Sequence, residues 1–494
     1  MSKYAPRPLI YADFPDPDVI CVDKKYYMIT TTMHMFPGGE ILMSKDLMHW
    51  EFCSFVFDTL DKTNAQQLNG ENIYGQGMWA ATLREHNGVF HVLFVCNDTH
   101  SAYHFTAGDI HGPWTKHDIA GFYHDCSLLF DGDRVFLTHG NRQIRLTEME
   151  KDLSKPRAGG IDTVIVRDSD EIPLGYEGSH FYKINGKYVL FLIHWPNTGH
   201  KRRTQACFIA DQPEGPYTGG DILDDDIGFF NQGVAQGGFI QGENGTGHAL
   251  LFQDRGACGR VPVLCDVKWE KGRPVLTPSL LPPAAAEEIA PLLPRATFRE
   301  ESLSPLFQFN HEPDRTHTYL TPRGLRIDTL PAADPEHARN TLTVRPIGPV
   351  CECSVTLDPS FLPEGGKAGL AALQGCFAAL QAERKNGLLF LRTVERIGMP
   401  GKLRSDEKIT LGEPHPLPEG PVRLMLRLNF EGLQDKADLY LISDKGPLPL
   451  LTAHRLFYRL DHFMGCRPAL FCYGEKETDG CAFFSDFEMT IPTE

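Results

Sequence analysis

Three acidic residues, Asp16, Asp125 and Glu177, each stand a few positions ahead of an apolar run typical of a β-strand. Two carboxylates on either side of a glycosidic bond can hydrolyse it. The protonated one donates to the leaving oxygen, and the ionised one activates water. A third carboxylate nearby raises the pKa of the acid by like-charge repulsion. The three acids therefore indicate a carboxylate-driven hydrolase, provided that the fold brings them together.

The elements that must position these acids are short strands in five similar units within residues 1–280. Each unit is an apolar strand, a tight polar turn and a second strand rich in aromatic residues. The turns fall about 45 to 65 residues apart, the spacing of four-stranded propeller blades. They are Asp23-Lys24-Lys25, Asn87-Gly88, Asp131-Gly132-Asp133, Asn185-Gly186 and Asn244-Gly245. The pattern predicts an all-β fold that begins with a five-bladed β-propeller, with an irregular β-sandwich as the alternative.

A different region follows the repeats. Residues 281–297 are rich in proline and alanine and are predicted to form a linker. Beyond them the repeat disappears, although strand patterns continue, as in 422–428 and 437–441. This pattern predicts an antiparallel, jelly-roll-like β-sandwich domain over residues 298–494.

The propeller prediction gives the three acids a common location. The first strand of each blade lines the central channel, and all five of these strands run in the same direction. The residues that open them are therefore expected to meet at one end of the channel. These residues are Asp16, Trp79, Asp125, Glu177 and Gln236. Asp18 follows Asp16 at an alternate strand position, and we interpret it as structural.

Composition limits the partners and the compartment. The formal net charge is −16, and no basic block offsets it, which argues against a nucleic-acid partner. No apolar run approaches the roughly 20 residues of a membrane span, and the N-terminus shows no apolar signal segment. Thirteen scattered cysteines, an odd number, favour reduced thiols over a disulfide framework. We therefore expect a cytoplasmic protein with no membrane partner.

Several short sequence segments have residue patterns typical of one enzyme family. They are 14–20, 36–38, 44–50, 176–178 and 251–256, with 309–314 and 338–343 in the second domain. As a set they resemble glycoside hydrolase family 43, specifically its β-xylosidases and α-L-arabinofuranosidases. The last two segments resemble the sandwich domain attached to β-xylosidases of that family. Together the matches cover nearly the whole chain.

The resemblance implies inverting hydrolysis at the non-reducing ends of xylo- and arabino-oligosaccharides, with release of β-D-xylose or α-L-arabinofuranose. Asp16 would be the general base, Asp125 the carboxylate that tunes and orients the acid, and Glu177 the general acid. Arg260 matches the family arginine that holds the sugar and braces the base. An exo-arabinanase or galactanase on the same propeller is the alternative. So is a carbohydrate-binding protein whose catalysis has lapsed, although the complete acid set argues against lapse.

Other residues near these motifs are candidate sugar ligands. Trp79 resembles the aromatic wall of the sugar subsite, and Phe36 is expected to form a second wall. The candidate polar ligands are Gln236 and His34, with His124, His180 and His194 also near the motifs. Family sandwich domains can also send a loop aromatic toward the active site, but the sequence does not identify that residue.

The resemblance assigns no metal ligand. Family members with calcium in the central channel tend to anchor it with a histidine in the fifth blade, where this chain has Ala235-Gln236. Zinc-binding spacings are also missing from the sequence. No cofactor is expected to be required, whereas a structural calcium ion at the channel centre and homo-oligomerisation both stay open.

Overall fold

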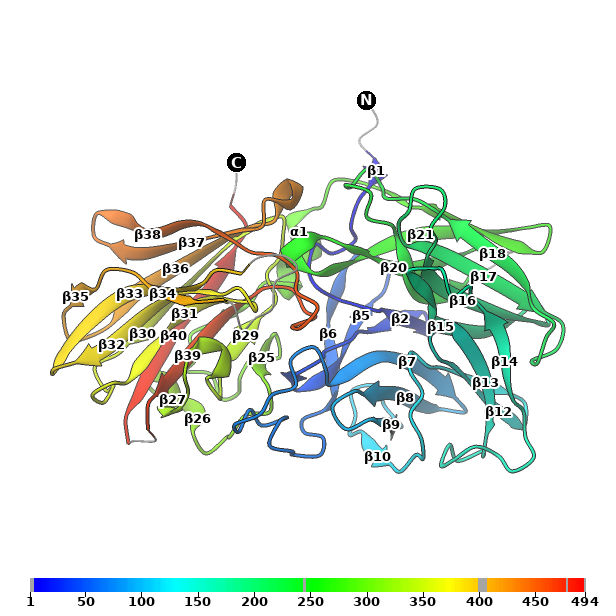
Figure 1. The fold of residues 1–494 in the computed structure, drawn as a ribbon, viewed down its shortest axis with the longest axis horizontal. Coiled ribbons are helices and arrows are strands. Elements are labelled where there is room, and N and C mark those ends of the chain that lie inside the picture. Colours follow the sequence, from blue (N-terminus) through cyan, green and yellow to red (C-terminus); the bar gives the residue numbers. More distant parts are fainter. Residues whose placement is uncertain (1–3, 243–245, 399–406, 477–478, 493–494) are drawn as a thin grey trace.

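The computed structural model describes residues 4–242, 246–398, 407–476 and 479–492, and strands dominate it (Figure 1). The short helical segments are α1 (Ala286–Ile289), η2 (Gly256–Cys258), η3 (Ala290–Leu292), η4 (Pro335–His337) and η6 (Glu431–Leu433). Among the described residues, no helix has the length and apolar character that a bilayer crossing needs.

Five four-stranded antiparallel sheets form the N-terminal part of the chain, each built from consecutive strands. The first is β2 (Asp18–Val22), β3 (Lys25–Ile29), β5 (Gly38–Ser44) and β6 (Trp50–Phe57). The second is β7 (Met78–His86), β8 (Val89–Cys96), β9 (Ser101–Ala107) and β10 (Thr115–His117). The third is β11 (Ser127–Asp131), β12 (Arg134–His139), β13 (Gln143–Met149) and β14 (Asp162–Arg167). The fourth is β15 (Leu174–Ile184), β16 (Lys187–Trp195), β17 (Thr204–Ala210) and β18 (Thr218–Leu223). The fifth is β19 (Ala235–Gln241), β20 (Thr246–Asp254), β21 (Arg260–Glu270) and β22 (Arg273–Pro278).

These sheets are the blades of a propeller, as predicted. Their first strands pack against one another in a closed ring, in the order β2, β7, β11, β15, β19 and back to β2. The N-terminal segment closes the ring, because the Leu9 N–H donates to the Pro262 carbonyl and the Gly238 N–H to the Pro17 carbonyl, both at 2.8 Å. The ring therefore joins the start of the chain to its fifth blade.

The predicted hairpin turns have the backbone conformation that their residues favour. Asn87 and Gly88 have φ values of 54° and 79°, and Asn185 and Gly186 have 50° and 76°. Both residues of each pair are thus left-handed, as the two-residue turns of right-twisted hairpins require. The predicted turn Asn244-Gly245 lies outside the described residues.

The C-terminal part is a sandwich of two sheets, also as predicted. One sheet has the order β26 (Thr318–Thr321), β27 (Gly324–Asp328), β40 (Cys481–Thr490), β30 (Val350–Asp358), β36 (Val422–Asn429), β37 (Lys436–Ser443), β38 (Gly446–Arg455), and β24 (Arg295–Ala296) pairs with β40. The other has the order β34 (Ile409–Leu411), β33 (Leu388–Arg396), β32 (Ala378–Lys385), β31 (Lys367–Leu373), β39 (Arg467–Gly474), β29 (Leu342–Val344), β25 (Phe307–Asn310), β4 (Met35–Phe36). Two further strands join this sheet, β28 (Leu330–Pro331) beside β39 and β35 (His415–Leu417) beside β33. Alternate residues of β36 face the core, since Leu424, Leu426 and Leu428 are fully buried.

The two parts of the chain share strands and core, and they lie side by side (Figure 1). The short strand β4 comes from the first blade segment, yet it extends a sandwich sheet through pairing of Phe36 with Phe309. Strand β1 (Ala5–Pro6) pairs with β23 (Leu280–Leu281), which follows the last blade. The segment predicted to be a linker holds β23, α1, η3 and β24, and β24 belongs to the sandwich. The junction is therefore hydrogen-bonded structure.

A buried ion pair fills the centre of the propeller channel. Asp18 of β2 accepts a hydrogen bond from Arg84 Nη1 of β7 at 2.6 Å, and Asp18 has no exposed surface. The Arg84 guanidinium also donates to the Ser127 hydroxyl and the Leu128 carbonyl of β11. On β15, His180 Nδ1 lies 3.2 Å from Asp18 Oδ1. This one charged pair thus joins the inner strands of blades one to four.

The Asp18–Arg84 ion pair also determines whether the channel centre can bind a calcium ion. Although burial opposes ionisation, Arg84 and His180 hold the pKa of Asp18 well below its usual range. The Asp18 oxygens also accept from the backbone N–H groups of Val19 and Leu83. Calcium takes about six to eight oxygen ligands, whereas this centre offers one carboxylate that a guanidinium already neutralises. The residues present do not fit the calcium ion that the sequence left open.

We predict that Arg84→Met lowers the free energy of unfolding by about 3–5 kcal/mol, because it leaves the Asp18 carboxylate buried without its counter-charge. Urea unfolding followed by circular dichroism measures this change. The matched control is Lys151→Met, which breaks an exposed ion pair with Asp133 and should leave the urea midpoint unchanged. An Arg84→Met protein that unfolds at the wild-type midpoint would contradict the prediction.

Candidate active site

A left-handed residue recurs at the mouth of every inner strand. Asp16, Ala80, Asp125, Gly178 and Gln236 have φ values of 49°, 22°, 49°, 63° and 57°. In blades two, four and five the pairing register shifts at this point, as it does at a β-bulge. The inner strand therefore turns as it begins, which directs side chains across the channel mouth.

These mouths enclose a small cavity of about 60 Å³. It is lined by Asp16, Trp79, His124, Asp125, Glu177, Ile193, Arg203, Gln236, Phe252, Arg260 and Phe463. The structure thus brings together the three predicted acids, Trp79, Gln236 and Arg260. It adds four residues that sequence reasoning did not place there, namely Ile193, Arg203, Phe252 and Phe463.

Asp16 lies at the mouth of blade one with both carboxylate oxygens engaged. Its Oδ1 accepts from Arg260 Nη1 at 2.6 Å, and its Oδ2 accepts from the Thr31 hydroxyl at 2.7 Å. Burial raises the pKa of Asp16, while Arg260 and Thr31 counteract this rise. The two donors hold the carboxylate in one orientation and favour its ionised form, which a general base requires.

Asp125 and Glu177 are linked by the imidazole of His124. The His124 Nε2 atom lies 3.7 Å from Asp125 Oδ2 and 3.8 Å from Glu177 Oε2. Asp125 Oδ2 also accepts from the Gly178 N–H at 3.1 Å. Burial raises the pKa of Asp125 and Glu177 adds to this effect, whereas His124 lowers it. One imidazole thus compensates two carboxylates that would otherwise repel each other.

Glu177 is the most accessible of the three acids. Its side chain is 19% exposed, against 7% for both Asp16 and Asp125. The Asn141 side-chain amide donates a hydrogen bond to Glu177 Oε2 and fixes the direction of the carboxyl group. Access together with a fixed orientation suits a group that must deliver a proton to a leaving oxygen. No motif in the sequence pointed to Asn141.

Two guanidinium groups present unused donors at the cavity. Arg260 Nε and Nη2 and Arg203 Nε are buried and have no hydrogen-bond partner among the described residues. Arg203 pairs through Nη1 with Asp254, as Arg260 does with Asp16. A buried donor left without an acceptor costs about 1–3 kcal/mol, so an acceptor oxygen that reached either guanidinium group would be stabilised there. The only sequence signal for Arg203 is the basic run 201–203 just ahead of β17.

A phenylalanine from the sandwich domain completes the cavity wall. Phe463 stacks on Trp79 with ring centroids 5.1 Å apart and an interplanar angle of 7°. Its ring centroid also lies 4.9 Å from Arg260 Cζ. Apolar ring faces suit the C–H face of a sugar, and the neighbouring guanidinium suits its hydroxyl groups. Phe463 occupies the place of the loop aromatic that the sequence did not identify.

Phe36 and His34 do not line the cavity. Phe36 does not form the expected second wall, because its backbone pairs with Phe309 of the sandwich and its ring packs on Phe57 in the blade core. His34 is fully buried among aromatic rings, with its centroid 4.7 Å from Tyr74 and 5.1 Å from His462. Of the other histidines, His180 lies in the channel with Asp18, and His194 pairs with Asp168 and Asp221.

The arrangement contains the parts of an acid–base hydrolase. One carboxylate is braced by a guanidinium, and a second, more accessible one is paired with a third through an imidazole. Among the described residues, His124, Asp125 and Glu177 also lie close enough together to ligate a metal ion, as do Asp334, Glu336 and His337. In the second group, Arg396 already pairs with both carboxylates. A five-bladed propeller with such a carboxylate set at one mouth defines the class of propeller glycosidases.

Comparison with protein families identifies the family. The model of glycosyl hydrolases family 43 matches residues 5–274, which is more than half of the chain. The model of the beta xylosidase C-terminal concanavalin A-like domain matches residues 295–490. The chain belongs to glycosyl hydrolase family 43.

Individual relatives agree with this assignment. A beta-xylosidase from Formosa agariphila is 26% identical over 356 residues, which cover 64% of this chain and 60% of that protein. A non-reducing end alpha-L-arabinofuranosidase from Bacteroides ovatus is 30% identical over 217 residues, covering 43% of this chain and 39% of that protein. The solved structure of a bifunctional GH43-CE protein from Bacteroides eggerthii superposes with a TM-score of 0.91 at 34% identity. It covers 100% of this chain, which spans 64% of that larger protein.

His124 makes the stability of the protein depend on pH. Asp125, and after it Glu177, raise the pKa of His124 from 6.5 to about 9, although burial opposes the rise. The imidazolium therefore contributes stability that is complete below pH 6.5 and is lost as the pH rises to about 9. We predict that wild-type protein loses more thermal stability between pH 6.5 and pH 9.5 than His124→Gln does.

Differential scanning fluorimetry at the two pH values measures this difference. The exposed His415, replaced in His415→Gln, is the control and should reproduce the wild-type response. Equal losses in wild type and His124→Gln would mean that His124 does not carry the extra proton in the folded state.

Proposed function

We propose that the protein is an exo-acting, inverting glycoside hydrolase. It releases β-D-xylose, α-L-arabinofuranose or both from the non-reducing ends of xylo- and arabino-oligosaccharides. The observation that carries this proposal is the convergence of Asp16, Asp125 and Glu177, from three different blades, in one cavity with Arg260. The names of the relatives support the choice of sugars.

The size and walls of the cavity support exo action. At about 60 Å³ it is far smaller than the roughly 300–1,000 Å³ of common ligand pockets. The stacked rings of Trp79 and Phe463 form one wall, and the channel below is filled by Asp18 and Arg84. A single terminal sugar ring suits such a space better than the middle of a chain does.

The three acids divide the chemistry. Asp16, oriented by Arg260 and Thr31, removes a proton from a water molecule as the water attacks the anomeric carbon. Glu177, held by Asn141, gives its proton to the departing oxygen. Asp125 acts on Glu177 through His124 and the Gly178 amide, which sits next to Glu177 in the chain. In an inverting enzyme the base and the acid stand about 6.5–9.5 Å apart, which leaves room for the water.

We predict that the two catalytic acids respond differently to the leaving group. Asp16→Ala should lower kcat about 10²–10⁴-fold on both xylobiose and 4-nitrophenyl glycosides, because every substrate needs the base. Glu177→Ala should lose a similar factor on xylobiose but much less on the 4-nitrophenyl glycosides, whose leaving group needs little protonation. Initial rates on β-D-xyloside and α-L-arabinofuranoside substrates measure both effects.

An acid outside the cavity serves as the control. Asp162 is exposed on β14, and Asp162→Ala should keep wild-type rates on all of these substrates. A near-wild-type rate for Asp16→Ala would refute the assignment of the base. Wild-type protein that binds xylo-oligosaccharides without turnover would instead identify a carbohydrate-binding protein whose catalysis has lapsed.

Product stereochemistry is a separate prediction. Because a water and not a protein group attacks the sugar, ¹H NMR of freshly released xylose should show the α-anomer first. Initial appearance of the β-anomer would mean retention and would exclude the single-displacement mechanism. Rates on arabino- and galacto-oligosaccharides in the same assay test the alternative of an exo-arabinanase or galactanase.

A further inference from the structure

The carboxylate of Asp13 accepts hydrogen bonds from two backbone amides that belong to different domains. Its Oδ1 accepts from the Arg260 N–H of the propeller at 2.7 Å. Its Oδ2 accepts from the Gly465 N–H of the sandwich at 2.8 Å. Asp13 is only 2% exposed, so water has little access to replace either bond. Each oxygen therefore has one fixed partner on one side of the domain junction.

Two glycines allow the backbone to approach this carboxylate. A β-carbon on Gly259 would lie 2.3 Å from Asp13 Oδ1, and one on Gly465 would lie 2.1 Å from the Cys258 carbonyl oxygen. A side chain at either position would push the two backbone segments apart, the one around Gly259 and the one around Gly465. The Cys466 N–H also donates to the Ala257 carbonyl at 2.8 Å, next to the same contact. The sandwich segment therefore meets the turn before β21 backbone to backbone.

Each amide that Asp13 holds is close to a side chain of the sugar cavity. Arg260 carries the guanidinium that braces Asp16. Phe463, two residues before Gly465, stacks on Trp79 and lies against Arg260. Asp13 itself lines no part of the cavity. It is thus placed to set how the base and the aromatic wall stand relative to each other.

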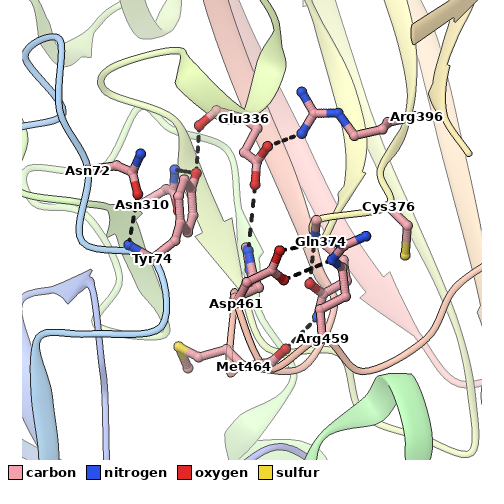
Figure 2. Close-up of polar contacts among 12 residues, drawn as sticks. Asn72, Tyr74, Asn310, Glu336, Gln374, Cys376, Arg396, Arg459, Asp461 and Met464 are labelled. Atoms are coloured by element: carbon pink, nitrogen blue, oxygen red, sulfur yellow. Dashed lines mark hydrogen bonds and ion pairs between the residues drawn. The ribbon is translucent and has the colours of Figure 1, made fainter. Parts of the chain in front are cut away.

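Other contacts shape the loop that carries Phe463, residues 456–466. Figure 2 shows Gln374, whose side-chain amide donates to the Met464 carbonyl at 2.5 Å, and Arg459, which pairs with Asp461 through two bonds of 2.8 Å. The Tyr458 hydroxyl donates to the Phe463 carbonyl at 2.7 Å. These contacts lie within the sandwich and give the loop its form. The bond to Asp13 fixes the loop against Arg260.

We propose that Asp13 is a positioning residue that couples the sandwich domain to the catalytic base. Its two hydrogen bonds set the register between the Arg260 strand and the Phe463 loop, so that the sugar cavity takes its final shape only when the sandwich is seated on the Asp13 carboxylate. The inference rests on the proposed function in one respect, because it places Arg260 and Phe463 in the sugar site.

The variant Asp13→Asn tests the coupling directly. It keeps the size of the side chain but replaces one acceptor oxygen by an NH₂ group, which faces an N–H donor and cannot bond it. The matched control is Glu288→Gln. Glu288 is a buried carboxylate of α1, in the segment between the two domains, and it pairs with Arg7 at 2.7 Å.

The first readout does not depend on activity. The chain has five tryptophans, and 5-fluorotryptophan labelling gives each of them a ¹⁹F NMR resonance. The Trp79 resonance is identified as the one that Trp79→Phe lacks. Its chemical shift reports whether the Phe463 ring is stacked on Trp79. Asp13→Asn should move this resonance toward its position in Phe463→Ala, whereas Glu288→Gln should leave it in place. An unmoved Trp79 resonance in a folded Asp13→Asn protein would overturn the proposal.

The second readout is kinetic. On 4-nitrophenyl glycosides, Asp13→Asn should lower kcat/KM about 10- to 100-fold, as expected when groups of a site shift by about 1 Å. Glu288→Gln should stay within about threefold of wild type. In the Phe463→Ala background the loss caused by Asp13→Asn should be at least about threefold smaller, because the two residues act through one contact. Equal losses in both backgrounds would refute the coupling.

A third measurement covers the case in which Asp13→Asn does not fold. In wild-type protein, hydrogen exchange should show the Arg260 and Gly465 amides opening together, with the same dependence on urea. Independent opening would overturn the proposal. If the protein proves inactive on every glycoside, the proposed function fails, while the NMR and exchange results still decide the role of Asp13.

Discussion

A left-handed backbone residue at the mouth of each inner strand is the constraint on which the active site depends. Residues with a side chain reach positive φ at a cost of about 1–3 kcal/mol, and four of the five mouths have one. The surrounding strands must therefore enforce this conformation. They do so through the ring of inner strands and through the Asp18–Arg84 pair beneath them. Without this turn, Asp16 and Asp125 would follow the ordinary alternation of a strand.

The propeller and its acid set could be predicted because they are local in sequence. Each blade repeats one hairpin pattern. The residue types of the turn pairs Asn87-Gly88 and Asn185-Gly186 predict the left-handed conformation that both pairs adopt. Once the blades are counted, the topology of a propeller places Asp16, Asp125 and Glu177 at one mouth. The alternation of leucines in β36 likewise predicted a sandwich strand.

The rest of the site depends on contacts between distant segments, which leave no local pattern. Phe36 is an aromatic residue of the kind that lines sugar pockets, but its backbone pairs with the sandwich sheet and its ring packs in the blade core. Phe463 reaches Trp79 only because the two domains dock as they do. Asn141 and Arg203 are ordinary loop residues until the fold brings Glu177 and Asp254 to them. Pairings between different elements decide these four cases, and a single sequence does not contain them.

The closure of the ring by the N-terminal segment has a consequence for how the protein is made. Arg260 emerges from the ribosome some 240 residues after its partner Asp16, and Phe463 emerges later still. A nascent chain therefore carries Asp16 long before it carries the arginine that pairs with it or the phenylalanine ring that lines the cavity. The cavity cannot assemble until the chain has been synthesised through Phe463. The complete cavity thus belongs to chains that include the sandwich domain, and a translation product that stops after the fifth blade lacks the wall formed by Phe463.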